Sequence, residues 1–263
     1  MNKRNFLSFG IVLGFVLLLV GCVGEVQVAQ KNPLNFTFES KNPAGPKSNK
    51  KILLLDSEIE LKLSSNGRIL NSQATEFDRY KKQFKANFRT TIEKMFQQQG
   101  YQIIDVDGVE YNDIPFNERK EGYMAVLIKG DINVDEMLSQ AKRSDNPFDS
   151  TSKTISGNYG ISGNVKIRFL EPLSGQVMDS LNINLAKFNI KVPFSISQEA
   201  NAGTFLFGNA ARPDLKDNSA DSTRKALNLL WAKLFDKIDN KIIYQTINSY
   251  EKDIKEIKHN KRF

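Results

Sequence analysis

The chain has almost none of the residues on which many enzyme and metal sites depend. Its 263 residues include one cysteine, Cys22, and one histidine, His259, which lies in a basic C-terminal tail. A histidine-based metal cluster needs a second histidine, and a lone tail histidine is poorly placed for cysteine–histidine catalysis, so neither is expected. One cysteine also excludes an intramolecular disulfide, so stability must come from packing.

Several familiar signatures are missing as well. There is no G-x-x-x-x-G-K-[ST] or G-x-G-x-x-G motif, and after the N-terminus no apolar run reaches membrane-spanning length. The acidic turn over residues 105–113 has its glycine in fourth rather than sixth place, which does not fit an EF-hand. We therefore expect no metal, no cofactor and no enzyme, although counting residues does not exclude a serine–lysine pair.

The charge pattern argues against nucleic acid as a partner. The formal net charge is +7, but basic and acidic residues alternate along almost the whole sequence. A nucleic-acid-binding surface needs basic residues gathered on one face. The positive balance is better explained by solubility or by attraction to acidic headgroups or glycans.

What is present begins at the N-terminus. A basic start at Lys3-Arg4 precedes an apolar stretch over residues 6–20, followed by a small residue. These are the three parts of an export signal, and the stretch is too short to span a membrane comfortably. The junction Leu19-Val20-Gly21-Cys22 resembles the lipobox of bacterial lipoproteins. The resemblance implies removal of residues 1–21 and acyl chains on the sulfur and the new amino group of Cys22.

The remaining chain divides by composition. Residues 41–50 combine prolines, a glycine and polar residues with no apolar period. Such a segment cannot offset its ordering entropy by burial. We therefore expect residues 22–50 to form a lipidated tether and residues 51–263 to form a single α+β domain that folds alone.

Two long helices are predicted. Between Thr75 and Gln99, apolar residues recur every three or four positions and so share one helix face: Phe77, Tyr80, Phe84, Phe88, Ile92 and Met95. Gly100 suits the left-handed residue that ends a helix. A second helix is expected over residues 222–258, where Leu227 and Trp231 begin a similar stripe. Both stripes are interpreted as core.

Alternating or apolar runs predict the strands, at residues 52–63, 101–106 and 123–134. The clearest hairpin joins residues 165–169 to 177–185 through a Pro-Leu-Ser-Gly turn. The polar stretches 136–164 and 191–221 are expected to be irregular loops.

This order predicts the fold class. We expect an α+β domain in which an antiparallel sheet of about four to six strands carries the two long helices on one face. The alternative is a helical subdomain that protrudes from the sheet, because the last predicted helix is long.

Several short sequence segments also resemble those of a known protein family. They run in order through most of residues 51–262 and include Lys51-Ile52-Leu53-Leu54-Leu55, Gln99-Gly100-Tyr101, Lys120-Glu121-Gly122-Tyr123-Met124-Ala125-Val126, Leu170-Glu171-Pro172-Leu173-Ser174-Gly175 and Ser249-Tyr250-Glu251-Lys252-Asp253-Ile254. The chain in this respect resembles the neuraminyllactose-binding hemagglutinin family, also described as flagellar sheath adhesins, and resembles it as a paralogue.

The resemblance implies a surface lipoprotein of the outer membrane or flagellar sheath, anchored by palmitate-type acylation at Cys22. It also implies an adhesin-like function with binding to sialylated host glycans. The alternative is a structural lipoprotein of the outer membrane or flagellar sheath with bacterial partners and no glycan binding. The sequence does not indicate an oligomeric state.

The resemblance also points to candidate ligand residues. The founding member carries a dense basic motif before the hairpin, and the corresponding segment here keeps only Lys142 and Arg143. Positive donors hold a sugar carboxylate well, so these two residues are the candidate ligand-binding pair. The alternative is that they belong to a solvated loop.

Overall fold

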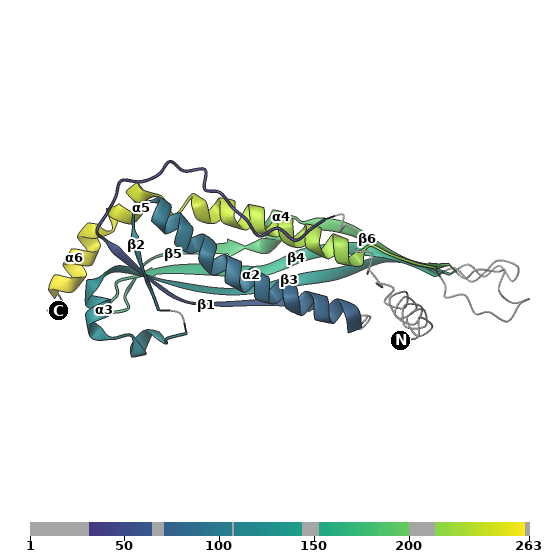
Figure 1. The fold of residues 1–263 in the computed structure, drawn as a ribbon, viewed down its shortest axis with the longest axis horizontal. Helices are drawn as coiled ribbons and strands as arrows, with labels where there is room; N and C mark the ends of the chain where they lie inside the picture. Colours follow the sequence, from purple (N-terminus) through teal and green to yellow (C-terminus); the bar gives the residue numbers. More distant parts are fainter. Residues whose placement is uncertain (1–31, 65–70, 107, 144–152, 200–213, 261–263) are drawn as a thin grey trace, which may run out of the picture. The chain divides into compact units, whose positions relative to one another are not determined.

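Long strands and two long helices organise the part of the chain that the structure describes. The computed structural model describes residues 32–64, 71–106, 108–143, 153–199 and 214–260 (Figure 1). All of them belong to one folded unit, Asn32–Phe263. In these ranges no helix combines the length and the apolar character needed to cross a membrane.

The elements follow one another along the chain in this order: β1 (Lys51–Ser64), α2 (Asn71–Gln98), β2 (Gln102–Asp105), η1 (Tyr111–Asp113), α3 (Phe116–Glu121), β3 (Gly122–Arg143), β4 (Lys153–Leu170), β5 (Val177–Asn184), η2 (Leu185–Phe188), β6 (Lys191–Glu199), β7 (Asp214–Asp217), α4 (Ser219–Asp239), α5 (Tyr244–Ser249) and α6 (Glu251–Asn260). The fold therefore mixes helices and strands, as the sequence predicts.

The sheet is mixed, so the prediction of a purely antiparallel sheet of four to six strands is wrong. Its seven strands have the order β2-β1-β3-β4-β6-β7, and β5 pairs with β4 beside this path. Strand β1 runs parallel to both β2 and β3, whereas the pairs from β3 onward are antiparallel. Helix α2 is the reason for the first parallel pair, because a helical crossover brings the chain back in the same direction.

The predicted hairpin is confirmed, because β4 and β5 pair antiparallel from Asn164↔Asn184 to Leu170↔Val177. The predicted loop over residues 136–164 is wrong. Strands β3 and β4 extend into it from both sides and pair as far as Arg143↔Lys153, and residues 144–152 lie outside the described residues. The first half of β4 also pairs with β6, so backbone hydrogen bonding to two neighbours overrides the loop-like composition.

The second predicted insert, residues 191–221, also contains regular structure. It includes β6, β7 and the first turn of α4, and β6 and β7 pair antiparallel. The apolar segment Phe205–Gly208 lies outside the described residues. Backbone hydrogen bonding between strands again determines the conformation of this segment, since β6 pairs with β4 on one side and with β7 on the other.

The first predicted helix is confirmed as α2, and Gly100 follows it with a left-handed φ of 86°. The second is not one continuous helix. Helix α4 ends at Asp239, and Ile242 donates its backbone N–H to Ile238 at the turn. The chain then continues as α5 and α6. Ile242 and Ile247, which follow this turn, are both buried.

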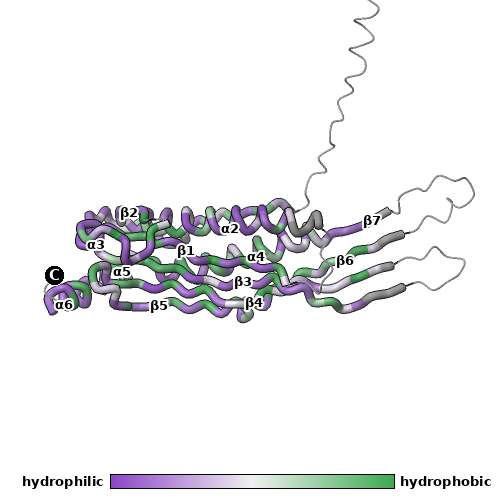
Figure 2. Tube along the Cα trace, turned by 90° about the horizontal axis from the view of Figure 1, so that it is seen from below, coloured by the Kyte–Doolittle hydropathy of each residue, from purple (hydrophilic) through white to green (hydrophobic). Residues whose placement is uncertain are grey.

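Strand β1 divides the core between the two faces of the sheet. Ile52 and Leu54 belong to the main cluster, which also includes buried residues of α2 and α4. Leu53 and Leu55 point to the opposite face, as successive strand residues do, and join a smaller cluster with Ile114. Figure 2 shows apolar and polar positions in succession along the strands.

Aromatic rings join the two long helices within the main cluster. Trp231 of α4 lies 5.2 Å from Phe84 and 6.2 Å from Phe88, both on α2, between ring centroids. Phe235 lies 4.9 Å from Phe88 and 4.4 Å from Trp231. All four side chains are at most 1% exposed, so the stripes predicted as core are core.

Residues 32–50, here called the N-terminal strap, lie against α2 and α4. Phe36 is 7% exposed, and its ring centroid lies 4.8 Å from that of Trp231. The backbone N–H groups of Gly45 and Ser48 donate to Gln98 and Gly100, at 3.0 and 2.9 Å. The strap therefore packs against α2 and α4, and the expected domain boundary at residue 50 stays a prediction.

Polar contacts fix the strap along α4. The Asn228 amide accepts from the Asn35 backbone N–H at 2.8 Å and donates to the Pro33 carbonyl at 2.9 Å. The Asp239 carboxylate accepts from the Lys41 backbone N–H at 2.9 Å. These contacts hold an extended segment that has no partner strand among the described residues.

Candidate functional site

Of the site residues predicted from the sequence, the structure describes two, Lys142 and Arg143. Cys22 lies outside the described residues. Lys142 and Arg143 form the end of β3, where they pair with Thr154 and Lys153 of β4. The two basic residues thus belong to a strand ladder, and the interpretation of this segment as a solvated loop is wrong.

A buried arginine organises the beginning of α4. Arg224 is 5% exposed and donates from Nη1 to the Glu76 carboxylate and the Tyr80 hydroxyl, both at 2.8 Å. Its Nη2 contacts Asp221, and its Nε donates to the carbonyl of Asn32 at 2.8 Å. Every nitrogen of this guanidinium is therefore engaged in joining α2, α4 and the strap.

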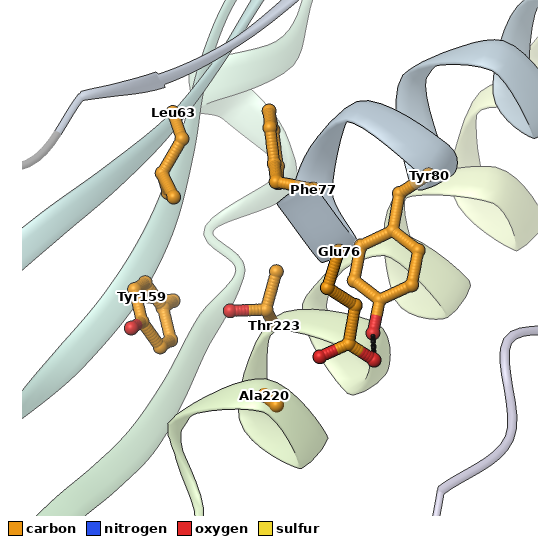
Figure 3. Close-up of a pocket in the computed structure, with 7 residues that line it drawn as sticks. All are labelled: Leu63, Glu76, Phe77, Tyr80, Tyr159, Ala220 and Thr223. Atoms are coloured by element: carbon orange, nitrogen blue, oxygen red, sulfur yellow. Dashed lines mark hydrogen bonds between the residues drawn. The ribbon is translucent and has the colours of Figure 1, made fainter. Parts of the chain in front are cut away.

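Glu76 and Tyr80, which contact this arginine, also line a pocket between β1, β4, α2 and α4 (Figure 3). Glu76 accepts a hydrogen bond from Tyr80 within it. Burial raises the pKa of Tyr80 to about 12, and the Glu76 carboxylate adds to this effect. The cavity has a volume of only about 10 Å³, room for about one water. We interpret it as a packing feature and not as a ligand site.

Metal and acid–base chemistry find little support in the described ranges. No three His, Cys, Asp or Glu side chains there come close enough together to hold a metal ion. His259 is exposed on α6, without the buried environment that usually tunes a general base.

Two surface grooves have an acidic lining. One, of about 550 Å³, lies on the outer face of the sheet and contains Asp56, Glu58 and Glu110 against a single basic residue, Lys129. Another, of about 360 Å³, lies between β5 and α6 and contains Asp253 and Glu256. Both would repel an anionic ligand.

A third groove has a basic lining and is here called the β5–α4 groove. It has a volume of about 560 Å³, within the range of small-ligand sites. Its charged residues are Lys187 of η2 and Lys237 of α4. Three asparagine side chains add neutral donors and acceptors: Asn164, Asn182 and Asn184. Three apolar side chains complete the lining: Leu181, Ile183 and Phe188.

The turn that carries Lys187 is well anchored. The Asn184 side chain accepts from the Ala186 backbone N–H at 3.0 Å and so caps η2. Leu185 is fully buried, and Asn189 ends the turn in a left-handed conformation with φ 48°. Lys233 of α4 donates to the Phe188 carbonyl at 2.8 Å. The groove is therefore built on fixed backbone rather than on a free loop.

Sequence reasoning missed this groove. The alternation of Leu181, Asn182, Ile183 and Asn184 predicts the strand but not what lies beside its edge. Strand β5 pairs only with β4 among the described strands, and α4 contacts both β5 and η2. Lys237 reaches the groove through this packing, for which the local sequence gives no signal.

Comparison with known proteins gives a consistent result. A family model described as "Neuraminyllactose-binding hemagglutinin precursor (NLBH)" matches residues 22–261. Two Helicobacter pylori proteins named neuraminyllactose-binding hemagglutinin are each 29% identical to this chain. The first match covers 92% of this chain and 90% of the relative, and the second covers 99% and 95%. The names of these relatives describe hemagglutinins and not enzymes.

The fold is similar to a solved structure as well. A crystal structure of a neuraminyllactose-binding hemagglutinin homologue from Helicobacter pylori has a TM-score of 0.55 and 19% identity, covering 83% of this chain and 99% of the other. At that identity the likeness concerns the fold alone. The family model, in contrast, spans most of the sequence, and the resemblance noted from the sequence is confirmed. The chain belongs to the neuraminyllactose-binding hemagglutinin family.

Proposed function

We propose that this protein is a lipid-anchored, adhesin-like protein of the outer-membrane surface that binds sialylated host glycans. The observation that most supports the proposal is the family match, which begins at Cys22 and continues to residue 261. The relatives are named for binding neuraminyllactose, a sialylated sugar. The family name thus suggests both the location and the class of ligand.

The anchor follows from the chemistry of Cys22. A thiolate is a strong nucleophile and a suitable acceptor for a diacylglycerol group. One acyl chain gives only weak, reversible membrane binding, whereas several chains hold a protein stably. With Cys22 as the first residue of the mature chain, the amino group would carry a further acyl chain such as palmitate.

Replacing the anchor tests this part of the proposal. We expect Cys22→Ser to leave the precursor with its signal uncleaved and without incorporation of labelled fatty acid. The matched control is Ser48→Ala, an alanine replacement downstream in the strap, which should be processed normally. Normal acyl labelling of Cys22→Ser would contradict the proposed anchor.

Exposure at the cell surface is tested on intact bacteria. We expect antibody against the folded body to bind intact cells, and external protease to remove that signal. A body facing the periplasm, or enclosed beneath a flagellar sheath, would stay protected until the membrane is opened. Such protection would contradict an adhesin and agree with a structural lipoprotein.

A further inference from the structure

We propose that the β5–α4 groove binds the terminal acidic sugar of a sialylated glycan, with its carboxylate between Lys187 and Lys237. This inference rests on the proposed function, since it assigns a place to the ligand class named there. It differs from the sequence-based hypothesis, which assigned the ligand to Lys142 and Arg143.

Charge selects this groove among the three open grooves described above. Its lining contains two lysines and no acid, whereas the others each contain at least two carboxylates. Neither Lys187 nor Lys237 is engaged in an ion pair within the described ranges. Both ammonium groups can therefore donate to an incoming carboxylate, and charge-assisted bonds of this kind are among the stronger ones.

The acid nearest in sequence is occupied elsewhere. Asp236 precedes Lys237, but its carboxylate pairs with Lys41 of the strap at 2.5 Å. The hydrogen bond from Lys41 holds the pKa of Asp236 below its usual range, so this acid stays charged and paired. Lys237 also acts electrostatically on Asp236, so the pairing with Lys41 weakens this competition without removing it. Lys233 adds a third positive charge on the same side of α4.

The neutral lining suits a sugar. The Asn184 carbonyl oxygen is engaged in capping η2, which fixes the side chain and leaves its NH₂ group for a ligand hydroxyl. Asn164 and Asn182 are exposed and add further donors and acceptors at the groove. The partly exposed ring of Phe188 and the side chain of Leu181 provide apolar surface for the carbon face of a pyranose ring. A mostly apolar wall with a few placed polar groups is typical of small-ligand sites.

The test uses the full chain in detergent micelles with two probes, 3′-sialyllactose and lactose, and measures binding by saturation-transfer NMR titration. We expect wild type to bind 3′-sialyllactose and to bind lactose much more weakly, because lactose lacks the carboxylate. The double variant Lys187→Ala/Lys237→Ala should bind 3′-sialyllactose about tenfold more weakly, with lactose binding unchanged. Lys187→Arg/Lys237→Arg should stay within about threefold of wild type, because it keeps the charge.

The matched control is Lys142→Ala/Arg143→Ala, which also removes two positive charges and should bind as wild type does. Retained binding in the groove double alanine variant, or its loss only in the Lys142/Arg143 variant, would overturn the inference and leave the proposed function intact. Failure of wild type to bind 3′-sialyllactose at all would overturn both. Circular dichroism of each variant verifies that the fold is unchanged.

Discussion

Replacing Phe36 by alanine tests whether the N-terminal strap belongs to the folded body. The Phe36 ring lies 4.8 Å from Trp231 on α4 and 5.2 Å from Phe84 on α2, between centroids. The side chain is 7% exposed and belongs to the main core cluster. Phe36→Ala would therefore open a hollow between the two long helices and remove the strap's deepest contact.

The expected magnitude follows from this burial. Replacing a buried phenylalanine by alanine costs about 3–5 kcal/mol. The strap has no partner strand and can settle into part of the hollow, so we expect a loss near the lower limit, about 3 kcal/mol. For a folded unit of this size each kcal/mol lowers Tm by about 2–4 °C, which gives a decrease of roughly 6–12 °C.

Trp231 makes the change measurable, because it is the only tryptophan in the chain. Urea unfolding followed by tryptophan fluorescence should show a lower midpoint for Phe36→Ala and a red-shifted native spectrum, since water gains access to the indole. Phe116→Ala is the matched control: this phenylalanine is 50% exposed on α3, and its loss should change stability by less than about 0.5 kcal/mol. Equal midpoints for wild type and Phe36→Ala would refute the reasoning and favour a body that begins at residue 51.

Two further variants probe the sheet and its edge. Gly163 has φ 106°, and an added Cβ would lie 2.0 Å from the Asp131 carbonyl oxygen. We therefore expect Gly163→Ala to lower the free energy of unfolding in urea by about 3 kcal/mol. The control is Gly108→Ala, which should cost about 1 kcal/mol, because Gly108 has φ 72° but open space around the added Cβ. For Asp179, burial would raise the pKa, but bonds from Lys241 and Tyr250 outweigh it and hold the pKa below its usual value. The charged carboxylate therefore stabilises the fold above its unfolded pKa of about 3.9, and this is lost as pH falls through the folded pKa. Asp179→Asn should cost about 1–2 kcal/mol at pH 7, and this cost should decrease steadily as the pH is lowered below about 3.9; a cost that does not change with pH would contradict the assignment.

Periodic patterns predicted the parts of the fold that bury one continuous face. The aromatic stripe of α2 is one example, since Phe84 and Phe88 are fully buried, and the β4–β5 hairpin is another. In both, neighbours in sequence bury together, so local spacing carries the information. The sequence did not indicate that β1 and β3 pair in parallel, because the alternation of apolar residues in a strand is the same whichever way its neighbour runs.

Composition misled where hydrogen bonding between distant segments decides the conformation. Residues 136–143 and 153–164 are polar and glycine-containing, yet they form a ladder because each strand supplies the other's partners. The strap is a similar case. Its prolines and polar residues suggested a tether, but Leu34, Phe36 and Phe38 pack against the main core cluster.

The candidate site shows why residues that come together only in the folded protein cannot be found from local sequence patterns. Lys142 and Arg143 drew attention because they are adjacent, but adjacency in sequence does not by itself place two charges around one ligand. Lys187 and Lys237 are far apart in the chain. A locally capped turn after β5 positions Lys187, and the packing of α4 against β5 and η2 brings Lys237 to the same groove. Only the second of these is a tertiary contact, but the basic pair depends on it and is therefore visible only once the fold is known. This is why the groove variants, rather than the adjacent basic pair, are the sharper test of where an acidic glycan would bind.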